Sequence, residues 1–211
     1  MKSFLMLCWE QIGGYVGLVA YITAIFSVIY AIRNKIATWP WGIVSVVLFG
    51  KIFLDAKDPL NAGLQVLYYL PVSIYGWYIW LRGGPKHSDD LPVTTISTRA
   101  RVAWVVGTVI TALFVGAIEA HYKKSDLPYT DATTTVISIV AQYLQTRKKF
   151  ENWVAWIVVD VIYAFWMFPK QHLLGLATLY VLFLIMAFQG AYQWRAIMSS
   201  HQVTLDTPKA A

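Results

Sequence analysis

Seven apolar segments, separated by short polar turns, make up nearly all of this 211-residue chain. A helix needs about 20 mainly apolar residues to cross a bilayer. The segments expected to span are 13–32, 38–54, 60–81, 100–120, 129–146, 152–168 and 173–198. Only 13% of the residues are charged, against about 25% in a soluble domain. The sequence therefore predicts an all-α polytopic membrane protein with little chain left for a soluble domain.

The first three and the last three of these segments resemble each other at one constant offset of 114 residues. The matches include uncommon residue types: Arg33 with Arg147, Trp39 with Trp153, Gly76 with Gly190 and Trp80 with Trp194. Because one helix separates the two triplets, both have the same orientation in the membrane. Transporters built from such parallel repeats bind their substrate near the midplane, between the repeats. The sequence predicts two parallel three-helix bundles joined by a linker helix, a 3+1+3 arrangement.

The expected division places the first bundle in 1–82, a loop and the linker helix in 83–128, the second bundle in 129–198 and a polar tail in 199–211. Arginine and lysine concentrate on one side of this arrangement, for example in the turn at 147–149. Cytoplasmic loops carry such an excess, so we expect the N-terminus outside and the C-terminus in the cytoplasm.

Charge and cysteine content exclude other classes of function. The net charge of +6 follows from the cytoplasmic turns of a membrane protein and does not indicate nucleic-acid binding. The single cysteine, Cys8, allows neither an intrachain disulfide nor a cysteine metal site. The sequence has no nucleophile elbow, zinc-protease helix or phosphate-binding loop, and its four histidines fall in predicted loops or the tail. We expect no enzyme, cofactor or metal site.

Polar side chains recur at helical spacing within three predicted spans. They are Asn61, Gln65, Tyr68 and Tyr75 in the third; Asp131, Thr134 or Thr135, Ser138, Gln142 and Gln145 in the fifth; and Trp153, Trp156, Asp160 and Tyr163 in the sixth. Each unsatisfied polar group costs several kcal/mol in lipid, so these stripes are expected to face one another or a cavity. Amides suit carboxamides and sugar hydroxyls, and aromatic faces suit a planar ring, especially a cationic one.

Simpler roles compete with binding for several of these residues. Tryptophans near helix ends commonly anchor a helix at the membrane surface, which is the role expected of Trp80 and Trp194. The same role, or helix capping, is an alternative for Trp39. The polar stripes could also hold helices together in a subunit that transports nothing.

Two segments resemble the PnuC-type nicotinamide riboside transporters of bacteria. One is residues 129–156, with the strings YTDA, SIVAQYL and RKKFENWVAW. The other is Leu64–Gln65 followed by YGWYIW at 75–80. The resemblance extends from the first predicted helix to Trp194. Asn61 departs from it, because the family is expected to carry an acid four residues before Gln65.

The resemblance implies a SWEET-like fold, a homotrimer in the bacterial inner membrane, and uptake of nicotinamide riboside by facilitated diffusion. It also implies that a cytoplasmic kinase traps the riboside by phosphorylation. Together with the polar stripes it indicates one substrate-binding set: Trp39, Gln65, Tyr68, Gln142, Asn152, Trp153, Trp156 and Asp160. Asp160 would face the pyridinium charge or a ribose hydroxyl. A related vitamin or sugar transporter of the same fold, with or without coupling to an ion, is the alternative.

Overall fold

The computed structural model describes residues 13–84, 91–122 and 125–206, with side chains as far as residue 200; Cys8 lies outside the described residues. The elements, in chain order, are α2 (Gly14–Ile32), α3 (Thr38–Asp55), α4 (Pro59–Leu64), the π-helical turn η1 (Gln65–Tyr69), α5 (Leu70–Arg82), α6 (Thr98–His121), α7 (Pro128–Thr146), α8 (Glu151–Ile162), the π-helical turn η3 (Tyr163–Met167), α9 (Phe168–Lys170) and α10 (Leu174–Asp206). The described chain is therefore almost entirely helical.

Five helical segments of the described chain are long and apolar enough to cross a membrane: Gly14–Ile32, Thr38–Asp55, Thr98–His121, Glu151–Lys170 and Leu174–Ser200. The other two predicted spans correspond to α7, which is 19 residues long but carries a polar stripe, and to the continuous helical stretch formed by α4, η1 and α5. Helix α10 continues to Asp206, into the segment for which we expected a polar tail.

Local sequence explains where several helices begin. Pro59 and Pro128 stand in the first turns of α4 and α7, where a missing N–H costs nothing. Asp58 caps α4, since its carboxylate accepts a hydrogen bond from the backbone N–H of Asn61 at 3.2 Å. Ser97 caps α6 in the same way through Ala100, at 3.3 Å. Such caps satisfy N–H groups that a helix leaves free at its start.

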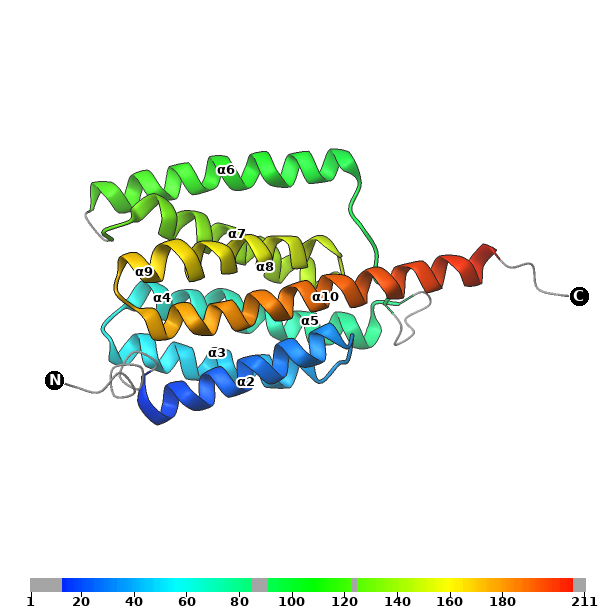
Figure 1. Ribbon diagram of the computed structural model, residues 1–211, viewed down its shortest axis with the longest axis horizontal. Coiled ribbons are helices and arrows are strands. Elements are labelled where there is room, and N and C mark those ends of the chain that lie inside the picture. The colour runs from blue at the N-terminus through cyan, green and yellow to red at the C-terminus, as the bar shows by residue number, and fades with distance from the viewer. Residues whose placement is uncertain (1–12, 85–90, 123–124, 207–211) are drawn as a thin grey trace, which may run out of the picture.

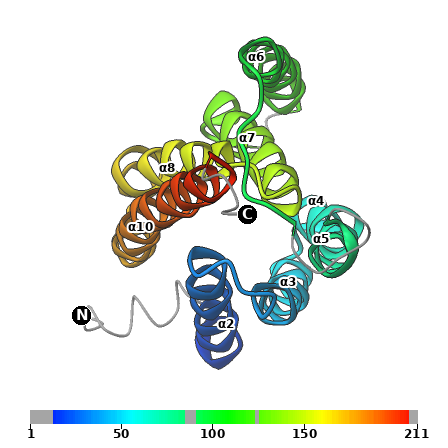
Figure 2. The same ribbon diagram turned by 90° about the vertical axis from the view of Figure 1, so that its right-hand side faces the viewer.

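The helices pack as two groups (Figure 1). Helix α3 packs against α2 and α5 in one group, and α8 packs against α7 and α10 in the other. Figure 2 looks along the helices and shows the two groups facing each other, with α6 at the edge beside α7. The groups meet where α10 contacts α2 and where α5 contacts α7.

A tryptophan at the start of α3 and another at the start of α8 each cover a glycine of a neighbouring helix. Trp39 covers Gly76, and Trp153 covers Gly190; at both glycines an added Cβ would fall closer than 3.0 Å to the indole. Both tryptophans are 2% exposed. Since the two pairs are 114 residues apart, the repeat in the sequence is also a repeat of packing contacts.

Trp80 and Trp194 connect the two groups of helices reciprocally. The indole N–H of Trp80 donates to the carbonyl oxygen of Gln145 at 3.2 Å, and that of Trp194 donates to the carbonyl oxygen of Ala31 at 2.9 Å. Gln145 stands 114 residues after Ala31, so each half makes the same contact with the other. The expectation that Trp80 and Trp194 anchor at the membrane surface is wrong: they are 3% and 0% exposed.

The turns between helices also repeat, but at two different offsets. Asn34 and Lys148, which are 114 residues apart, both have left-handed backbones, with φ of 53° and 47°. Lys57 and His172 form the second such pair, with φ of 56° and 58°, and they are 115 residues apart. The backbone hydrogen bonds around both pairs of turns match at the same offsets.

The prediction of one constant offset is therefore wrong around the second pair of turns, and the π-helical turns explain why. A π-helical turn holds one more residue than an α-helical turn. Turn η3 lies between Trp153 and His172, and raises the offset from 114 to 115. Turn η1 lies between Lys57 and Gly76, and returns it to 114.

Candidate functional site

A cavity of about 330 Å³ lies between the two groups of helices, and both groups supply its lining. Most of the predicted substrate-binding set lines it: Trp39, Gln65, Gln142, Trp153, Trp156 and Asp160. The acid is 4% exposed, so its carboxylate is largely removed from bulk water. The structure thus brings together side chains from α3, η1, α7 and α8 that are far apart in the sequence.

Tyr68 and Asn152 belong to the predicted set but are not among the residues that line the cavity. The Tyr68 hydroxyl donates to the carbonyl oxygen of Ile139 at 2.6 Å, which ties η1 to α7. Asn152 is fully buried, and its Nδ2 donates to the carbonyl oxygen of Lys149 at 2.6 Å. Its Oδ1 has no hydrogen-bond partner. Both residues are placed to support the site rather than to line it.

A second hollow of about 990 Å³ adjoins the cavity and shares residues such as Gln65 and Tyr163 with it. Its lining includes Asp55, Asp58, Glu119, Asp126 and Asp131. The residues of this lining include neither lysine nor arginine. At the other end of α3 and α8, the four tryptophans 39, 80, 153 and 194 form a buried cluster. The cavity therefore continues toward an acidic end of the molecule and meets packed indoles at the opposite end.

The repeat places equivalent positions of α2 and α7 on the cavity, with different chemistry. Ala24 of α2 corresponds to Ser138 of α7, and Val28 corresponds to Gln142. The Gln142 amide lies 3.5 Å from the Ser73 hydroxyl of α5. The α7 side of the cavity is therefore polar, whereas the α2 side is mostly apolar.

The same contrast holds between the stretch α4–η1–α5 and α10. Gln65 corresponds to Tyr180, and Ser73 corresponds to Ala187, and all four line the cavity. The α5 side is thus polar and lies next to α7, while α10 lies next to α2. The cavity consequently has a polar wall from α4–η1–α5 and α7 and a more apolar, aromatic wall from α2 and α10.

The helices α3 and α8 complete the cavity, and their side chains at equivalent positions differ most between the two halves. Gly42 and Val46 of α3 correspond to Trp156 and Asp160 of α8. Only the second half therefore supplies a large indole and a carboxylate at these positions. A ligand would find an indole and an acidic side chain on α8, and the smaller, uncharged Gly42 and Val46 on α3.

The polar wall includes Tyr69 and Ser73, which lie outside the predicted set. A regular helix that presents Asn61 and Gln65 presents Tyr68 next, which is the basis for Tyr68 in that set. The extra residue in η1 brings Tyr69 to the cavity instead. The spacing of four residues between Asn61, Gln65, Tyr69 and Ser73 was the signal that could have revealed it.

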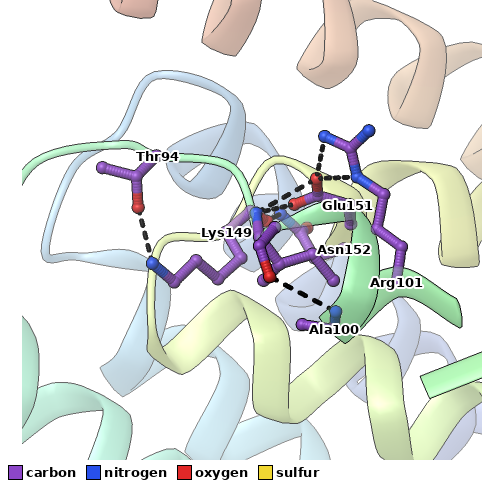
Figure 3. A network of polar contacts seen from close by, with 8 residues as sticks. Thr94, Ala100, Arg101, Lys149, Glu151 and Asn152 are labelled. Carbon is purple, nitrogen blue, oxygen red and sulfur yellow. Dashed lines mark hydrogen bonds and ion pairs between the residues drawn. The ribbon is translucent and has the colours of Figure 1, made fainter. Parts of the chain in front are cut away.

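The segment before α6 docks on the turn between α7 and α8, close to the start of α8 (Figure 3). The backbone N–H of Thr94 donates to the carbonyl oxygen of Lys148 at 3.1 Å, and the N–H of Phe150 donates to the carbonyl oxygen of Thr94 at 2.9 Å. The Lys149 ammonium adds a hydrogen bond to the Thr94 hydroxyl at 2.7 Å. The described part of the predicted long loop is thus ordered against this turn.

Glu151 completes this contact. Its carboxylate accepts the backbone N–H of Ile96 at 3.2 Å, and Arg101 of α6 pairs with it at 2.9 Å (Figure 3). Two residues later the chain reaches Trp153, which lines the cavity. The network therefore fixes the turn that sets the position of Trp153.

Comparison with known proteins supports a transporter. The family model described as "Nicotinamide mononucleotide transporter" matches residues 14–196. The nicotinamide riboside transporter PnuC of Escherichia coli K12 is 25% identical over 210 residues, covering 86% of this chain and 87% of that protein. The PnuC of Neisseria mucosa is 27% identical over 193 residues, covering 87% and 73%. The riboflavin/roseoflavin transporter RibM of Streptomyces davaonensis is 34% identical over 151 residues, covering 69% and 68%.

The fold agrees with these matches. A crystal structure of the vitamin B3 transporter PnuC superposes with a TM-score of 0.69 at 24% identity, covering 93% of this chain and 90% of that one. The family model spans most of the chain, and the matched relatives are membrane transporters rather than enzymes. The chain therefore belongs to the nicotinamide mononucleotide transporter family and is a PnuC-type multi-pass membrane transporter.

Proposed function

We propose that this protein transports nicotinamide riboside, and that the cavity between its two halves is the binding site. The division of the cavity into a polar and an aromatic side carries the proposal. Nicotinamide riboside has a planar, positively charged ring, a carboxamide and a ribose. The ring suits an aromatic surface beside a carboxylate, while the carboxamide and the ribose suit amides and hydroxyls.

Each lining residue has a role in this proposal. Trp156 stacks on the pyridinium ring, and Asp160 stabilises its charge or accepts a ribose hydroxyl. Gln65 and Gln142 bind the carboxamide and the sugar from the polar wall. Trp39 is a further donor, because its indole N–H has no hydrogen-bond partner and a buried donor without a partner costs about 1–3 kcal/mol.

Trp153 and Asn152 complete the proposed site at the start of α8. The indole N–H of Trp153 is also without a hydrogen-bond partner, as is the Oδ1 of Asn152. Trp153 lines the cavity, whereas Asn152 would reach the ligand only after a small movement of α8. Tyr68 would act on the site indirectly, through its hydrogen bond to α7.

We propose that seven helices span the bacterial inner membrane as two parallel three-helix bundles of SWEET-like design. Residues 1–82 form the first bundle, 83–128 the loop and linker helix, 129–198 the second bundle and 199–211 the tail. The reciprocal hydrogen bonds of Trp80 and Trp194 support two equivalent halves. The N-terminus lies outside and the C-terminus in the cytoplasm, which places the basic turn at 147–149 inside.

In this orientation the acidic hollow faces outward, toward the side from which a cation arrives. Rocking of the two bundles about the cavity would then expose the ligand to the cytoplasm. Transport is facilitated diffusion, and a cytoplasmic kinase keeps the riboside inside by phosphorylating it. The assembly is a homotrimer, as the resemblance to PnuC transporters implies.

Titration calorimetry on the detergent-purified protein tests the substrate. Nicotinamide riboside is the ligand, and nicotinamide, ribose and thiamine are comparators that each match only part of it. We expect saturable binding of the riboside and much weaker binding of its fragments, because the two sides of the cavity would each contribute. A folded sample that binds none of these compounds would contradict the proposal.

A second candidate substrate is riboflavin, favoured by the 34% identity with RibM of Streptomyces davaonensis. Riboflavin also joins a flat ring to a polyol, but its ring is neutral. Adding riboflavin to the same titration separates the two candidates. Binding of riboflavin without binding of the riboside would keep the fold and the site but change the substrate.

A further inference from the structure

The two π-helical turns both adjoin the cavity. Gln65 and Tyr69, the first and last residues of η1, line it, and so does Tyr163, the first residue of η3. Single π-helical turns are rare and are found frequently at functional sites. Since each turn marks a place where the two halves differ by one residue, its effect on the cavity can be read by comparing the halves.

The comparison shows what η1 does. Residues of the first half that face the two hollows follow each other in steps of four: Asn61, Gln65, Tyr69 and Ser73. Their counterparts on α10 follow in steps of four, three and four: Leu176, Tyr180, Phe183 and Ala187. A residue in an α-helix turns by about 100°, so every step of four drifts by about 40°. The wider turn η1 removes this drift at the step from Gln65 to Tyr69, and all four side chains stay on one wall.

Turn η3 absorbs one extra residue in the second half, between α8 and α9. Trp156, Asp160 and Tyr163 face the cavity before the extra residue, and Met167 and Phe168 face the acidic hollow after it. Their counterparts near the end of α3 are Ile52 and Phe53, which lie in a helix without such a turn. Since α3 reaches the same hollow without such a turn, the extra residue determines which residues of the second half, Met167 and Phe168, arrive there.

We propose that η1 and η3 are positioning elements of the transport pathway. In each, the wider turn absorbs one additional residue, which in a regular helix would rotate the later part by about 100°, and both parts face the pathway. Turn η1 keeps Asn61 and Gln65 on the same wall as Tyr69 and Ser73. Turn η3 aligns the part that carries Asp160 with the part at the acidic end.

Removing the extra residue from η1 has a defined consequence. Leu67 is 80% exposed on the outer side of the helix, so its deletion removes no lining side chain. Without Leu67, Asn61, Gln65, Tyr69 and Ser73 would follow in steps of four, three and four, the spacing with which α10 presents Leu176, Tyr180, Phe183 and Ala187. A regular α-helical turn would then replace η1, and all four side chains would stay on the same wall.

Cysteine accessibility tests the geometry without any ligand. In a Cys8→Ser background, since Cys8 is the only cysteine, the variants are Gln65→Cys, Tyr68→Cys and Tyr69→Cys. A water-soluble thiol reagent should modify positions 65 and 69 at least about tenfold faster than position 68, because reactivity follows access to water. Fast modification at 68 with slow modification at 69 would show a regular helix and overturn the proposal.

The deletion of Leu67 then tests the consequence, with Leu67→Ala as the control that keeps the length. In the deletion, access to the reagent should stay at Asn61→Cys and should not appear at Leu60→Cys, because η1 only absorbs the extra residue. Riboside binding should be kept in the deletion as in Leu67→Ala. Access that moves from Asn61→Cys to Leu60→Cys in a folded deletion variant would mean that one part of the helix has rotated, and it contradicts the proposal.

The deletion of Phe165, which is 63% exposed, with Phe165→Ala as its control, repeats the test in η3. If a deletion prevents folding, the cysteine scan at 65, 68 and 69 still decides the geometry. The expected effect on riboside binding rests on the proposed function. If the protein with its own sequence binds no riboside while the access pattern holds, the substrate is wrong and the positioning role stands.

Discussion

The indole ring of Trp153 lies over Gly190, so close that a Cβ at position 190 would fall 2.5 Å from the ring. The same ring lies edge-on to Trp194, with centroids 5.5 Å apart and planes at 88°. The equivalent pair in the first half, Trp39 and Trp80, has centroids 5.4 Å apart and planes at 88°. These contacts close one end of the cavity, so they connect the repeat in the sequence with the shape of the site.

The contact with Trp153 makes Gly190 sensitive to substitution. Gly190→Ala should lower the free energy of unfolding by about 1–3 kcal/mol, the usual cost of overpacking, measured as a lower thermal midpoint in detergent. Gly107→Ala on α6 is the matched control, because an added Cβ there meets no atom within 4 Å. It should be neutral or stabilising by up to about 1 kcal/mol. Equal effects of the two substitutions would contradict the packing described.

Much of the fold could be predicted because apolar length and the 114-residue repeat are properties of the chain itself. The roles of Trp80 and Trp194 could not, since a tryptophan near a helix end looks the same whether it meets lipid headgroups or a carbonyl of another helix. Their partners, Gln145 and Ala31, are set by packing between the two halves.

In the site, Trp156, Asp160 and Gln142 were predicted to face a cavity from their helical spacing, and they line it. A regular helical period puts Tyr68 on the same face. A single extra residue in η1 moves Tyr69 to the cavity instead. No propensity of the residues in η1 announces a π-helical turn, and the four-residue spacing of Asn61, Gln65, Tyr69 and Ser73 is the one sequence signal of the altered register.

Trp156→Ala tests stacking on the ligand ring. Binding of nicotinamide riboside should weaken by about tenfold or more, because a desolvated cation–π contact contributes about 2 kcal/mol. Trp166→Ala is the control, since Trp166 is 50% exposed and is not among the cavity-lining residues. Calorimetry on both variants gives the comparison. An affinity of Trp156→Ala equal to that of the control would exclude Trp156 as a stacking residue.

Asp160→Asn separates the two roles proposed for the acid. If the carboxylate stabilises the pyridinium charge, the variant should bind the cationic riboside several-fold more weakly, and bind the neutral dihydro form of the riboside as before. If it accepts a ribose hydroxyl, both ligands should weaken together. Affinities from competition titrations distinguish these results. No change with either ligand would remove Asp160 from the site.

The network around Glu151 predicts that replacing Glu151 lowers stability more than replacing its ion-pair partner Arg101. Glu151→Ala should lower the free energy of unfolding by about 1–3 kcal/mol, because the backbone N–H of Ile96 loses its acceptor. Arg101→Ala should cost at most about 1 kcal/mol, since the Arg101 side chain is 49% exposed. Thermal midpoints of the purified variants provide the test. A larger effect of Arg101→Ala would mean that the ion pair, not the docking of the segment before α6, holds the turn.

Proteoliposomes offer a test of ion coupling. Facilitated diffusion predicts that an imposed pH gradient leaves the initial rate of riboside uptake unchanged, because no proton accompanies the substrate. Asp160 is the buried acid of the cavity and would be the first candidate for a proton carrier. Uptake that follows the direction of the gradient, and that loses this dependence in Asp160→Asn, would replace facilitated diffusion by proton coupling.

Counterflow of labelled nicotinamide riboside decides whether this protein transports the riboside. Proteoliposomes preloaded with unlabelled riboside are placed in a trace of labelled riboside, without any ion gradient. We expect transient, saturable accumulation of label that unlabelled riboside abolishes, that Trp156→Ala reduces and that Trp166→Ala leaves unchanged. No counterflow with the riboside, together with counterflow of riboflavin or of no compound, would contradict the proposed function.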